Sequence, residues 1–233
     1  TVAGPKSCIS SISTVPEYMT VPLNETERGA IDDDAWIDIE RVPATVFAVG
    51  PGLGTDPGAK RFVGDVLTGT ALPLVLDADA LNIVAGSPEL FEQRSVGPIV
   101  VTPHPGEMAR LMRTTVEEVQ RNRVEIARTY ASEKNVYVVL KGAGTLVASP
   151  SGEVFVNLTG NPGMACGGMG DVLTGMIAAW LAQLRDPAEA AKLAVYSHGL
   201  AGDLAAKQVG EISLNASDLI DRIGRSLVTI EKS

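Results

Sequence analysis

Four short apolar segments, each ending in glycine or polar residues, constrain the fold more than any other feature of the chain. They lie at residues 45–49, 72–76, 98–101 and 136–140 and are rich in Val or Leu. Runs of this length, nearly continuous in apolar residues, are typical of parallel strands that are buried on both faces. The ends of such strands meet at one edge of an open sheet, where these sheets bind their ligands. The sequence therefore predicts a ligand site at the carboxyl edge of a parallel sheet.

Helical patterns separate and follow these segments. Apolar residues recur at helical spacing over residues 115–134, 171–184 and 187–209, and a last helix is predicted to begin near residues 215–218. Ser151 and Gly152 indicate a hairpin turn between two further strands. Strands alternating with helices predict an α/β fold with a mostly parallel central sheet flanked by helices. No repeat, linker or low-complexity tract divides residues 1–233, so we expect a single domain.

Composition and charge exclude several classes of protein. The 233 residues are 45% hydrophobic and 20% charged, which is ordinary for a globular protein and too apolar for a disordered one. The two cysteines, Cys8 and Cys166, lie far apart, which argues against a disulfide scaffold and favours a reducing, cytoplasmic compartment. A formal net charge of −9 disfavours nucleic acid and anionic membranes as partners. We expect neither a signal peptide nor a transmembrane helix.

The most informative stretch runs from Thr159 to Asp171, carries five glycines and leads directly into the strongest helical pattern. Glycines at 167, 168 and 170 allow backbone N–H groups to converge on an anion in front of a helix N-terminus. Asp171 at the head of that helix has two interpretations. It is either the N-cap, which the spacing alone slightly favours, or a base beside a transferring phosphoryl group.

The segment Lys141-Gly142-Ala143-Gly144-Thr145 is a second candidate, because it offers a positive charge and close backbone approach to a ligand. Taken alone, a tight turn with an exposed lysine is the better interpretation. A P-loop is disfavoured because no Gly-Lys-Ser/Thr sequence ends a glycine loop. The segment at residues 50–54, Gly-Pro-Gly-Leu-Gly, is a poor dinucleotide fingerprint because of its proline and the Thr-Asp-Pro that follows.

A third cluster lies at residues 103–107, where prolines on both sides restrict His104. This rigid histidine at a strand end suggests ligand contact, and Glu107 either holds a metal through water or occupies the first turn of a helix. His198 is expected to be a packed, hydrogen-bonded helix residue. Without a His/Cys cluster, no zinc or other protein-held metal site is predicted. Cys166, inside the glycine loop, is interpreted as a small packing residue rather than a nucleophile.

Taken together, five segments closely resemble the ADP-dependent NAD(P)H-hydrate dehydratase family, which has a three-layer, ribokinase-like fold. These segments occur in order at residues 49–54, 76–82, 102–107, 141–145 and 160–175. The resemblance implies a lyase that repairs nicotinamide rings damaged by hydration, NADHX and NADPHX. A nucleotide phosphorylates the ring hydroxyl, and loss of phosphate restores the double bond, giving AMP and phosphate when ADP is the donor.

The resemblance also assigns roles to individual residues. It implies that Asp171 takes the hydroxyl proton, which shifts the interpretation of this residue from cap to base, and that the turn with Gly168 and Gly170 stabilises the transferring group. The hydrated dinucleotide is expected to contact Gly52, His104 and Asp171. The residues expected to contact the adenine nucleotide are Lys141, Gly142, Ala143, Gly144, Thr145, Gly170 and Asn161. ADP is the expected co-substrate with ATP possible, and Mg²⁺ is expected with the phosphates, without a dedicated protein cage.

One departure from the family bears on whether this polypeptide is active alone. Family members usually carry a strand, a glycine-rich loop and a helix before the position of Thr1, and residues 1–3 resemble the end of a strand already under way. We therefore expect either that another chain supplies this segment or that the chain is a cleaved or incomplete product. An epimerase domain, often fused in the family, would also come from elsewhere, and a homo-oligomer is expected from the family alone. The alternatives are a ribokinase-like small-molecule kinase and an inactive nucleotide-binding fragment or subunit.

Overall fold

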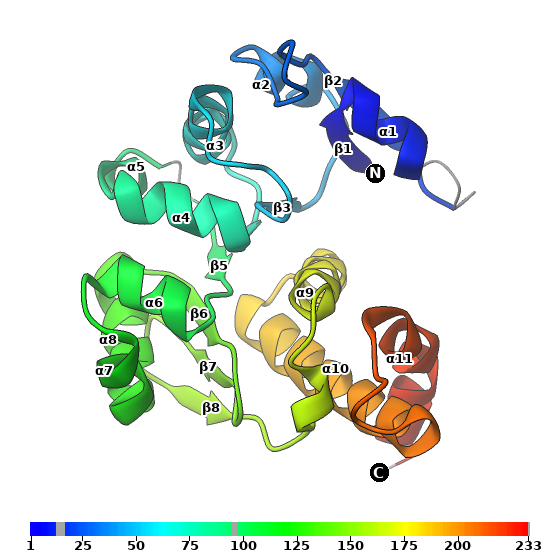
Figure 1. Ribbon diagram of the computed structural model, residues 1–233. Helices are drawn as coiled ribbons and strands as arrows, with labels where there is room; N and C mark the ends of the chain where they lie inside the picture. Colours follow the sequence, from blue (N-terminus) through cyan, green and yellow to red (C-terminus); the bar gives the residue numbers. More distant parts are fainter. Residues whose placement is uncertain (13–16, 95–96, 233) are drawn as a thin grey trace.

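A six-stranded sheet forms the centre of the molecule (Figure 1). The computed structural model describes residues 1–12, 17–94 and 97–232. The strands are hydrogen-bonded in chain order: β3 (Phe47–Val49), β4 (Leu74–Leu76), β5 (Ile99–Val101), β6 (Tyr137–Leu140), β7 (Leu146–Ala148) and β8 (Val154–Val156). β3 to β6 are parallel, whereas β7 and β8 form antiparallel pairs. All four apolar segments are confirmed as strands, each starting one or two residues later than expected, and Gly152 lies in the predicted hairpin turn.

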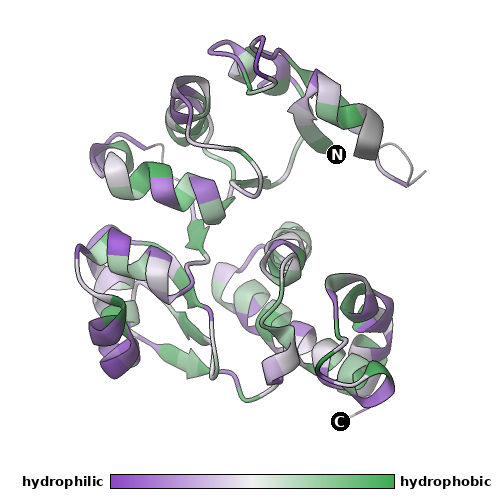
Figure 2. Ribbon diagram, viewed as in Figure 1, coloured by the Kyte–Doolittle hydropathy of each residue, from purple (hydrophilic) through white to green (hydrophobic). Residues whose placement is uncertain are grey.

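Alternate residues of the strands face two different layers of helices. Leu76, Val101 and Leu140 belong to one apolar cluster, whereas Val75 and Val100 belong to another. The first cluster includes side chains of α3 (Pro57–Gly69), α4 (Ala78–Gly86), α5 (Glu89–Glu92), α6 (Pro105–Met112), α7 (Val116–Arg121) and α8 (Arg123–Lys134). The second includes side chains of α9 (Met169–Leu184) and α10 (Pro187–Val209). The predicted three-layer α/β arrangement is therefore present, and Figure 2 shows the strands as mostly apolar.

The remaining helix on this side, α11 (Ala216–Glu231), packs mainly on α10. Asn215 is its N-cap: the Asn215 side chain accepts hydrogen bonds from two backbone N–H groups, and the Asp218 carboxylate accepts one from the backbone N–H of Asn215. This capping box confirms the predicted helix start. The expected helix over residues 115–134 is instead two helices, because the chain breaks at Asn122, which has non-helical dihedral angles of −124° and 37°. Within the described residues, no helix is long and apolar enough to cross a membrane.

The N-terminal part of the chain forms a second, smaller sheet. β1 (Val2–Pro5) and β2 (Thr20–Leu23) pair in parallel, next to α1 (Lys6–Ile12) and α2 (Ala35–Ile39). Trp36 of α2 contacts Phe47 of β3 and Phe62 of α3 edge-on, with ring centroids 5.9 Å and 6.5 Å apart. This packing ties the small sheet to the larger one, although no ladder of hydrogen bonds joins the two sheets in the part of the chain that is described.

Candidate active site

The carboxyl ends of the parallel strands bring three of the predicted segments to one edge of the sheet. The backbone N–H of Asp77 donates to Val49 O, that of Thr102 to Leu76 O, and that of Lys141 to Pro103 O. These bonds extend the parallel ladder past the last residue of each strand. The sequence analysis predicted that residues 50–54, 102–107 and 141–145 lie at one edge of the sheet. The backbone hydrogen bonds at the strand ends agree with this prediction.

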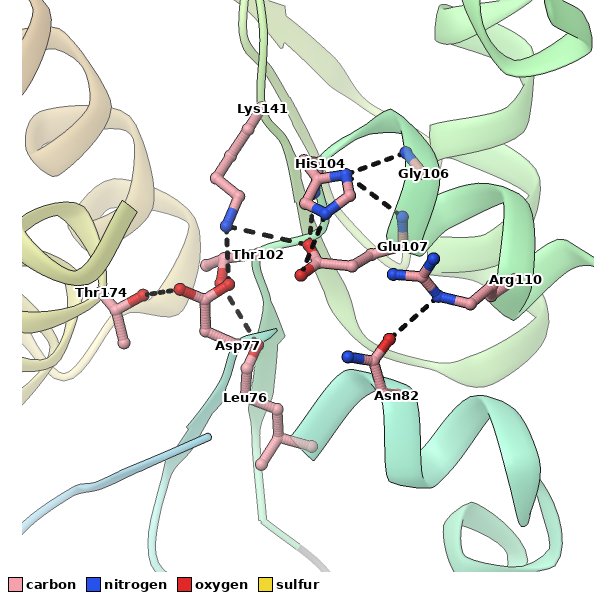
Figure 3. Close-up of polar contacts among 10 residues, drawn as sticks. All are labelled: Leu76, Asp77, Asn82, Thr102, His104, Gly106, Glu107, Arg110, Lys141 and Thr174. Atoms are coloured by element: carbon pink, nitrogen blue, oxygen red, sulfur yellow. Dashed lines mark hydrogen bonds and ion pairs between the residues drawn. The ribbon is translucent and has the colours of Figure 1, made fainter. Parts of the chain in front are cut away.

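Asp77 lies at the centre of this edge and is almost fully buried, with 1% of its surface exposed. Its Oδ1 is 2.6 Å from Lys141 Nζ, and its Oδ2 accepts a hydrogen bond of 2.7 Å from Thr174 Oγ1 on α9 (Figure 3). A second carboxylate, that of Glu107, lies 3.9 Å from the same ammonium. Lys141 is therefore not the freely exposed lysine of a surface turn, because a buried anion fixes its position.

His104 and Glu107 form a reciprocal cap at the start of α6. His104 Nδ1 accepts hydrogen bonds from the backbone N–H groups of Gly106 (2.9 Å) and Glu107 (3.3 Å), and the Glu107 carboxylate accepts one from the His104 backbone (2.7 Å). Since Nδ1 is an acceptor, the ring proton is on Nε2, which lies 3.3 Å from Glu107 Oε1. Burial lowers the pKa of His104, with Glu107 opposing that effect, so this neutral tautomer is favoured at neutral pH.

This geometry answers the two questions left open for the cluster. Half of the His104 side chain is exposed although both ring nitrogens are engaged, so its ring remains accessible to a ligand. Glu107 is nine-tenths buried in the first turn of α6 and is committed to the cap. Among the described residues, no group of three or more His, Cys, Asp or Glu side chains is arranged to hold a metal ion.

The head of α9 presents backbone donors rather than a capping side chain. Gly168 is the N-cap, with a left-handed φ of +85°, and the first intrahelical bond runs from Val172 N to Gly168 O (3.0 Å). The N–H groups of Met169, Gly170 and Asp171 precede that bond, which leaves them available to an anion. The slight preference of the spacing for Asp171 as the cap is wrong, because Asp171 is the third residue of the helix and a glycine holds the cap position.

The Asp171 carboxylate is exposed at this helix end and has no ion-pair or hydrogen-bond partner among the described residues. Its pKa is raised, first by partial burial and then by the negative charge of Asp77, with Lys141 acting in the opposite direction. A carboxylate with a raised pKa is a better proton acceptor than an ordinary one. The structure thus places a basic carboxylate beside a set of anion-binding N–H groups.

The segment from Lys141 to Thr145 forms a turn that is held from behind by Arg123. The Arg123 guanidinium donates to the carbonyl oxygens of Leu140, Lys141 and Gly144, at 3.1–3.4 Å. Thr145 Oγ1 donates to Gly142 O (3.0 Å), and Gly142 to Gly144 are exposed. Gly142 has a φ of +130°, a backbone conformation that favours glycine. This turn and Gly170 meet at Lys141, because a Cβ on Gly170 would lie 3.4 Å from Lys141 Nζ.

Two other predicted residues lie in loops around this edge. Gly52 is exposed in the loop after β3, has a φ of +68°, and has open space where a side chain would be. Asp79 Oδ2 anchors this loop by accepting from Gly54 N (2.9 Å). Asn161 is already engaged within the glycine loop, since its side chain accepts from Gly163 N (3.1 Å) and donates to Asp203 Oδ1 (2.9 Å). These bonds hold the loop, and the nucleotide contact of Asn161 stays a prediction.

The remaining histidine and cysteine take structural positions. His198 is buried, and its Nε2 donates to Met169 O (3.0 Å), as expected for a packed, hydrogen-bonded residue. Burial lowers the pKa of His198 to about 4. Cys166 is exposed, with its Sγ 3.5 Å from Leu214 O. The interpretation of Cys166 as a packing residue is therefore only partly right.

Sequence reasoning missed three residues that organise the site. Asp77 was noted only as a polar strand end, and neither Thr174 nor Arg123 was singled out. Each of these residues bonds to a partner that is distant in the sequence. Asp77 and Lys141 are 64 residues apart, Asp77 and Thr174 are 97 apart, and Arg123 and Leu140 are 17 apart. The one available signal was the polar residue that directly follows an apolar strand, which pointed to Asp77 without naming its partners.

The ordered segments match a known protein family over nearly the whole chain. Residues 1–225 match the family described as NAD(P)H-hydrate dehydratase. The chain belongs to the NAD(P)H-hydrate dehydratase family. The ADP-dependent (S)-NAD(P)H-hydrate dehydratase of Neisseria meningitidis serogroup B is 41% identical to this dehydratase-family chain over 198 residues, 81% of this chain and 67% of the relative. The resemblance inferred from the five segments is thereby confirmed.

Several longer relatives are named as bifunctional enzymes. The bifunctional NAD(P)H-hydrate repair enzyme Nnr of Moorella thermoacetica is 47% identical over 219 residues, which cover 93% of this chain and 41% of the relative. The chain thus spans about two-fifths of the length of that relative.

Solved structures confirm the predicted fold. The ADP/ATP-dependent NAD(P)H-hydrate dehydratase from Bacillus subtilis, co-crystallised with ATP/Mg²⁺ and soaked with CoA, has a TM-score of 0.81 at 32% identity, covering 97% of this chain and 78% of that one. A ribokinase-like superfamily protein from Enterococcus faecalis V583 has a TM-score of 0.78 at 30% identity, covering 99% and 75%. A hydroxyethylthiazole kinase from Pyrococcus horikoshii, at 20% identity and a TM-score of 0.63 over 81% of this chain and 73% of that one, shares the fold alone.

Proposed function

We propose that this chain carries the dehydratase activity of its family, converting (S)-NADHX and (S)-NADPHX to NADH and NADPH with ADP as the phosphoryl donor. The observation that carries the proposal is the exposed, basic Asp171 carboxylate within a helix head whose N–H groups are free to bind an anion. Membership of the family supplies the substrate class. The geometry supports a phosphoryl transfer, because that reaction needs a proton acceptor and stabilisation of charge at the same point.

In the proposed reaction, Asp171 accepts the proton of the ring hydroxyl as the hydroxyl oxygen bonds to the terminal phosphorus of ADP. The bond from that phosphorus to the bridging oxygen breaks, and AMP leaves with the bridging oxygen. The carbon–oxygen bond of the phosphate ester then breaks, a neighbouring ring carbon gives its proton to water, and the ring double bond re-forms with release of phosphate. The N–H groups at Gly170 and Asp171 stabilise the charge on the transferring group. They are in position because the left-handed Gly168 directs the chain into α9.

The nucleotide is proposed to occupy the turn from Lys141 to Thr145, beside Gly170. The exposed backbone of Gly142, Ala143 and Gly144 allows close approach of a planar or phosphate group, and the Lys141 ammonium supplies positive charge near the helix head. ADP is the proposed donor and ATP an alternative, since the Bacillus subtilis structures are described as ADP/ATP-dependent and co-crystallised with ATP/Mg²⁺. We propose that Mg²⁺ arrives with the phosphates, because the nearby carboxylates of Asp77 and Glu107 are already paired.

The hydrated dinucleotide is proposed to contact Gly52, His104 and Asp171. Gly52 offers open backbone in the loop after β3. His104 offers the face of its ring, because both ring nitrogens are engaged in the cap of α6. This contact is best suited to stacking against a flat group of the substrate.

We further propose that residues 1–233 act as one ribokinase-like unit, in a cytoplasmic homo-oligomer, with an epimerase activity supplied by another part of the protein or by another chain. The bifunctional relatives support the last point by name. The packing of Trp36 against β3 and α3 supports a single unit.

The test is turnover of NADHX by the purified chain with Mg²⁺ and either ADP or ATP, followed by the near-ultraviolet absorbance of the reduced nicotinamide. A rise that depends on the nucleotide is expected, with ADP as the better donor. A reaction without nucleotide is the control for spontaneous loss of water. Nucleotide binding without any rise would contradict the proposal and favour the inactive nucleotide-binding alternative. The kinase alternative is not favoured, since the family match and the named relatives are dehydratases.

A further inference from the structure

Asp77 occupies an N-cap position yet does not cap its helix. It directly precedes α4 and has extended dihedral angles of −136° and 166°, the conformation of an N-cap, but its side chain makes no capping hydrogen bond. An aspartate at this position ordinarily satisfies the first backbone N–H groups of the helix. The carboxylate is instead directed to Lys141 and Thr174 (Figure 3).

The local backbone is unusual at the same point. Ala78, the first residue of α4, has a left-handed φ of +48°, which is unfavourable for a residue with a side chain. Gly50 approaches so closely that a Cβ there would lie 1.7 Å from Asp77 O, so only glycine fits. Strain of this kind persists where the surrounding structure fixes a residue for a purpose, so Asp77 merits a functional explanation.

The two oxygens of Asp77 join parts of the site that are distant in sequence. One oxygen pairs with Lys141 after β6, and the other accepts from Thr174, one turn into α9. A Cβ on Gly170 would lie 3.4 Å from Lys141 Nζ and 3.9 Å from Asp77 Oδ2. The ion pair therefore lies directly against the first turn of α9, the turn that also carries Asp171.

The charges around Asp171 come from these same two groups. Lys141 is within 4.0 Å of Asp77 and Glu107, and no ion pair joins it to Asp171 in the described ranges. Besides burial, Asp77 raises and Lys141 lowers the pKa of Asp171. An ammonium freed from Asp77 could turn towards Asp171, with which it already interacts electrostatically, and pairing would make Asp171 a weaker base.

We propose that Asp77 is a positioning residue of this site, which holds the Lys141 ammonium against the first turn of α9 and thereby keeps the Asp171 carboxylate unpaired. The catalytic role in this inference rests on the proposed function, but the arrangement of Asp77, Lys141 and Asp171 does not depend on a substrate. Asp77 touches no reacting atom. It acts through the position of Lys141 and through its own charge.

The decisive variant is Asp77→Asn, which keeps the size and an acceptor for Thr174 but removes the negative charge. The carboxyl carbon of Asp171, labelled with ¹³C and assigned by its absence in Asp171→Asn, is titrated in the protein without ligands. The expected result is a lower pKa of Asp171, by on the order of one pH unit, because an anion is lost and a cation is released. In the pH profile of kcat, the acidic limb is expected to move to lower pH by the same amount, and the plateau value of kcat is expected to fall.

Thr174→Val is the matched control, because it breaks the second bond of Asp77 and leaves both charges in place. We expect a lower melting temperature with an unmoved Asp171 titration. If Asp77→Asn lowers the melting temperature and also leaves the titration unmoved, Asp77 is structural only and the inference is overturned. If Asp77→Asn does not fold, Lys141→Met serves instead. Loss of the cation should then raise the pKa of Asp171, and a constant or lower pKa would overturn the inference.

The ligand-free titration separates this inference from the proposed function. A shifted Asp171 pKa in Asp77→Asn, together with NADHX turnover by the wild-type chain, supports both the inference and the proposed function. A shift without turnover by the wild-type chain contradicts the proposed function and leaves the arrangement around Asp77 supported. Turnover without a shift contradicts only the inference.

Discussion

At the scale of single residues, the site depends on which polar groups are paired and which are left free. Asp77 and Glu107 are paired with neighbouring groups, whereas the Asp171 carboxylate has no hydrogen-bond or ion-pair partner among the residues that the structure describes. A carboxylate with a raised pKa beside unfilled backbone donors can accept a proton next to a bound anion.

Asp171→Asn is expected to abolish turnover of NADHX while leaving the affinity for ADP within severalfold. The variant keeps the shape of the side chain and all backbone N–H groups, and removes only the proton acceptor, which is worth a factor of about 10²–10⁴ in rate. Single-turnover kinetics and ADP titration measure the two effects separately. A variant that keeps most of its rate would exclude Asp171 as the base.

Lys141→Ala is expected to weaken binding of ADP more than binding of NADHX, because the ammonium lies beside Gly170 in the proposed nucleotide site. The exposed Lys60 provides a matched control, and Lys60→Ala should change neither affinity. Calorimetric titration of each ligand into each variant gives the comparison. Equal losses for both ligands in Lys141→Ala would argue against this division of the site.

His104→Asn and His104→Ala separate the two roles of the histidine. Asparagine can cap α6 as His104 does, whereas alanine cannot, so only the alanine variant should lose about 1 kcal/mol of unfolding free energy. Both variants lack the ring and should raise KM for NADHX to a similar extent. Denaturant unfolding and steady-state kinetics measure the two effects. An asparagine variant with wild-type KM would show that His104 serves the cap alone.

At the scale of elements, the position of α9 decides the geometry of the site. Thr174 ties α9 to Asp77 at the sheet edge, and His198 of α10 ties its first residue, Met169, from the other side. The left-handed Gly168 sets the direction in which the helix begins. Stability of this helix start should therefore depend on the protonation of His198.

Wild-type stability is expected to fall as pH falls from 6.5 towards 4. Burial lowers the pKa of His198 from 6.5 to about 4 in the folded chain, so the unfolded chain binds the proton first and unfolding is favoured across that window, by about 3 kcal/mol at most. Well above pH 6.5 the residue is neutral in both states and contributes no pH dependence. His198→Gln, which can still donate to Met169 O without titrating, should lose much of this dependence in thermal melts. An identical pH profile in both proteins would contradict the assignment.

At the scale of the whole molecule, the sequence predicts the frame of the fold better than the interior of the site. The strands were found because Val75, Val100 and Val139 and their neighbours are buried on both faces, which produces uninterrupted apolar runs. The break at Asn122 was missed because residues 116–119 and 124–130 both carry apolar residues at helical spacing, so the polar run 120–123 was taken as an interruption within one helix. Asp77 and Thr174 were missed as a pair because they are 97 residues apart, and side-chain pairing across that distance leaves no trace in local periodicity.

One cavity lies away from this edge. A space of about 710 Å³ is lined by Phe91, Arg94, Tyr137 and neighbouring residues, none of them a predicted site residue.

The measurement that tests the account most directly is the joint quantification of AMP and reduced nicotinamide formed from ADP and NADHX by the purified chain. The proposed reaction predicts one AMP for each NADH, with both products absent in Asp171→Asn. Release of AMP without NADH would mean that the helix head transfers phosphoryl groups to another acceptor. That result would contradict the assignment of hydrated nicotinamide as the substrate.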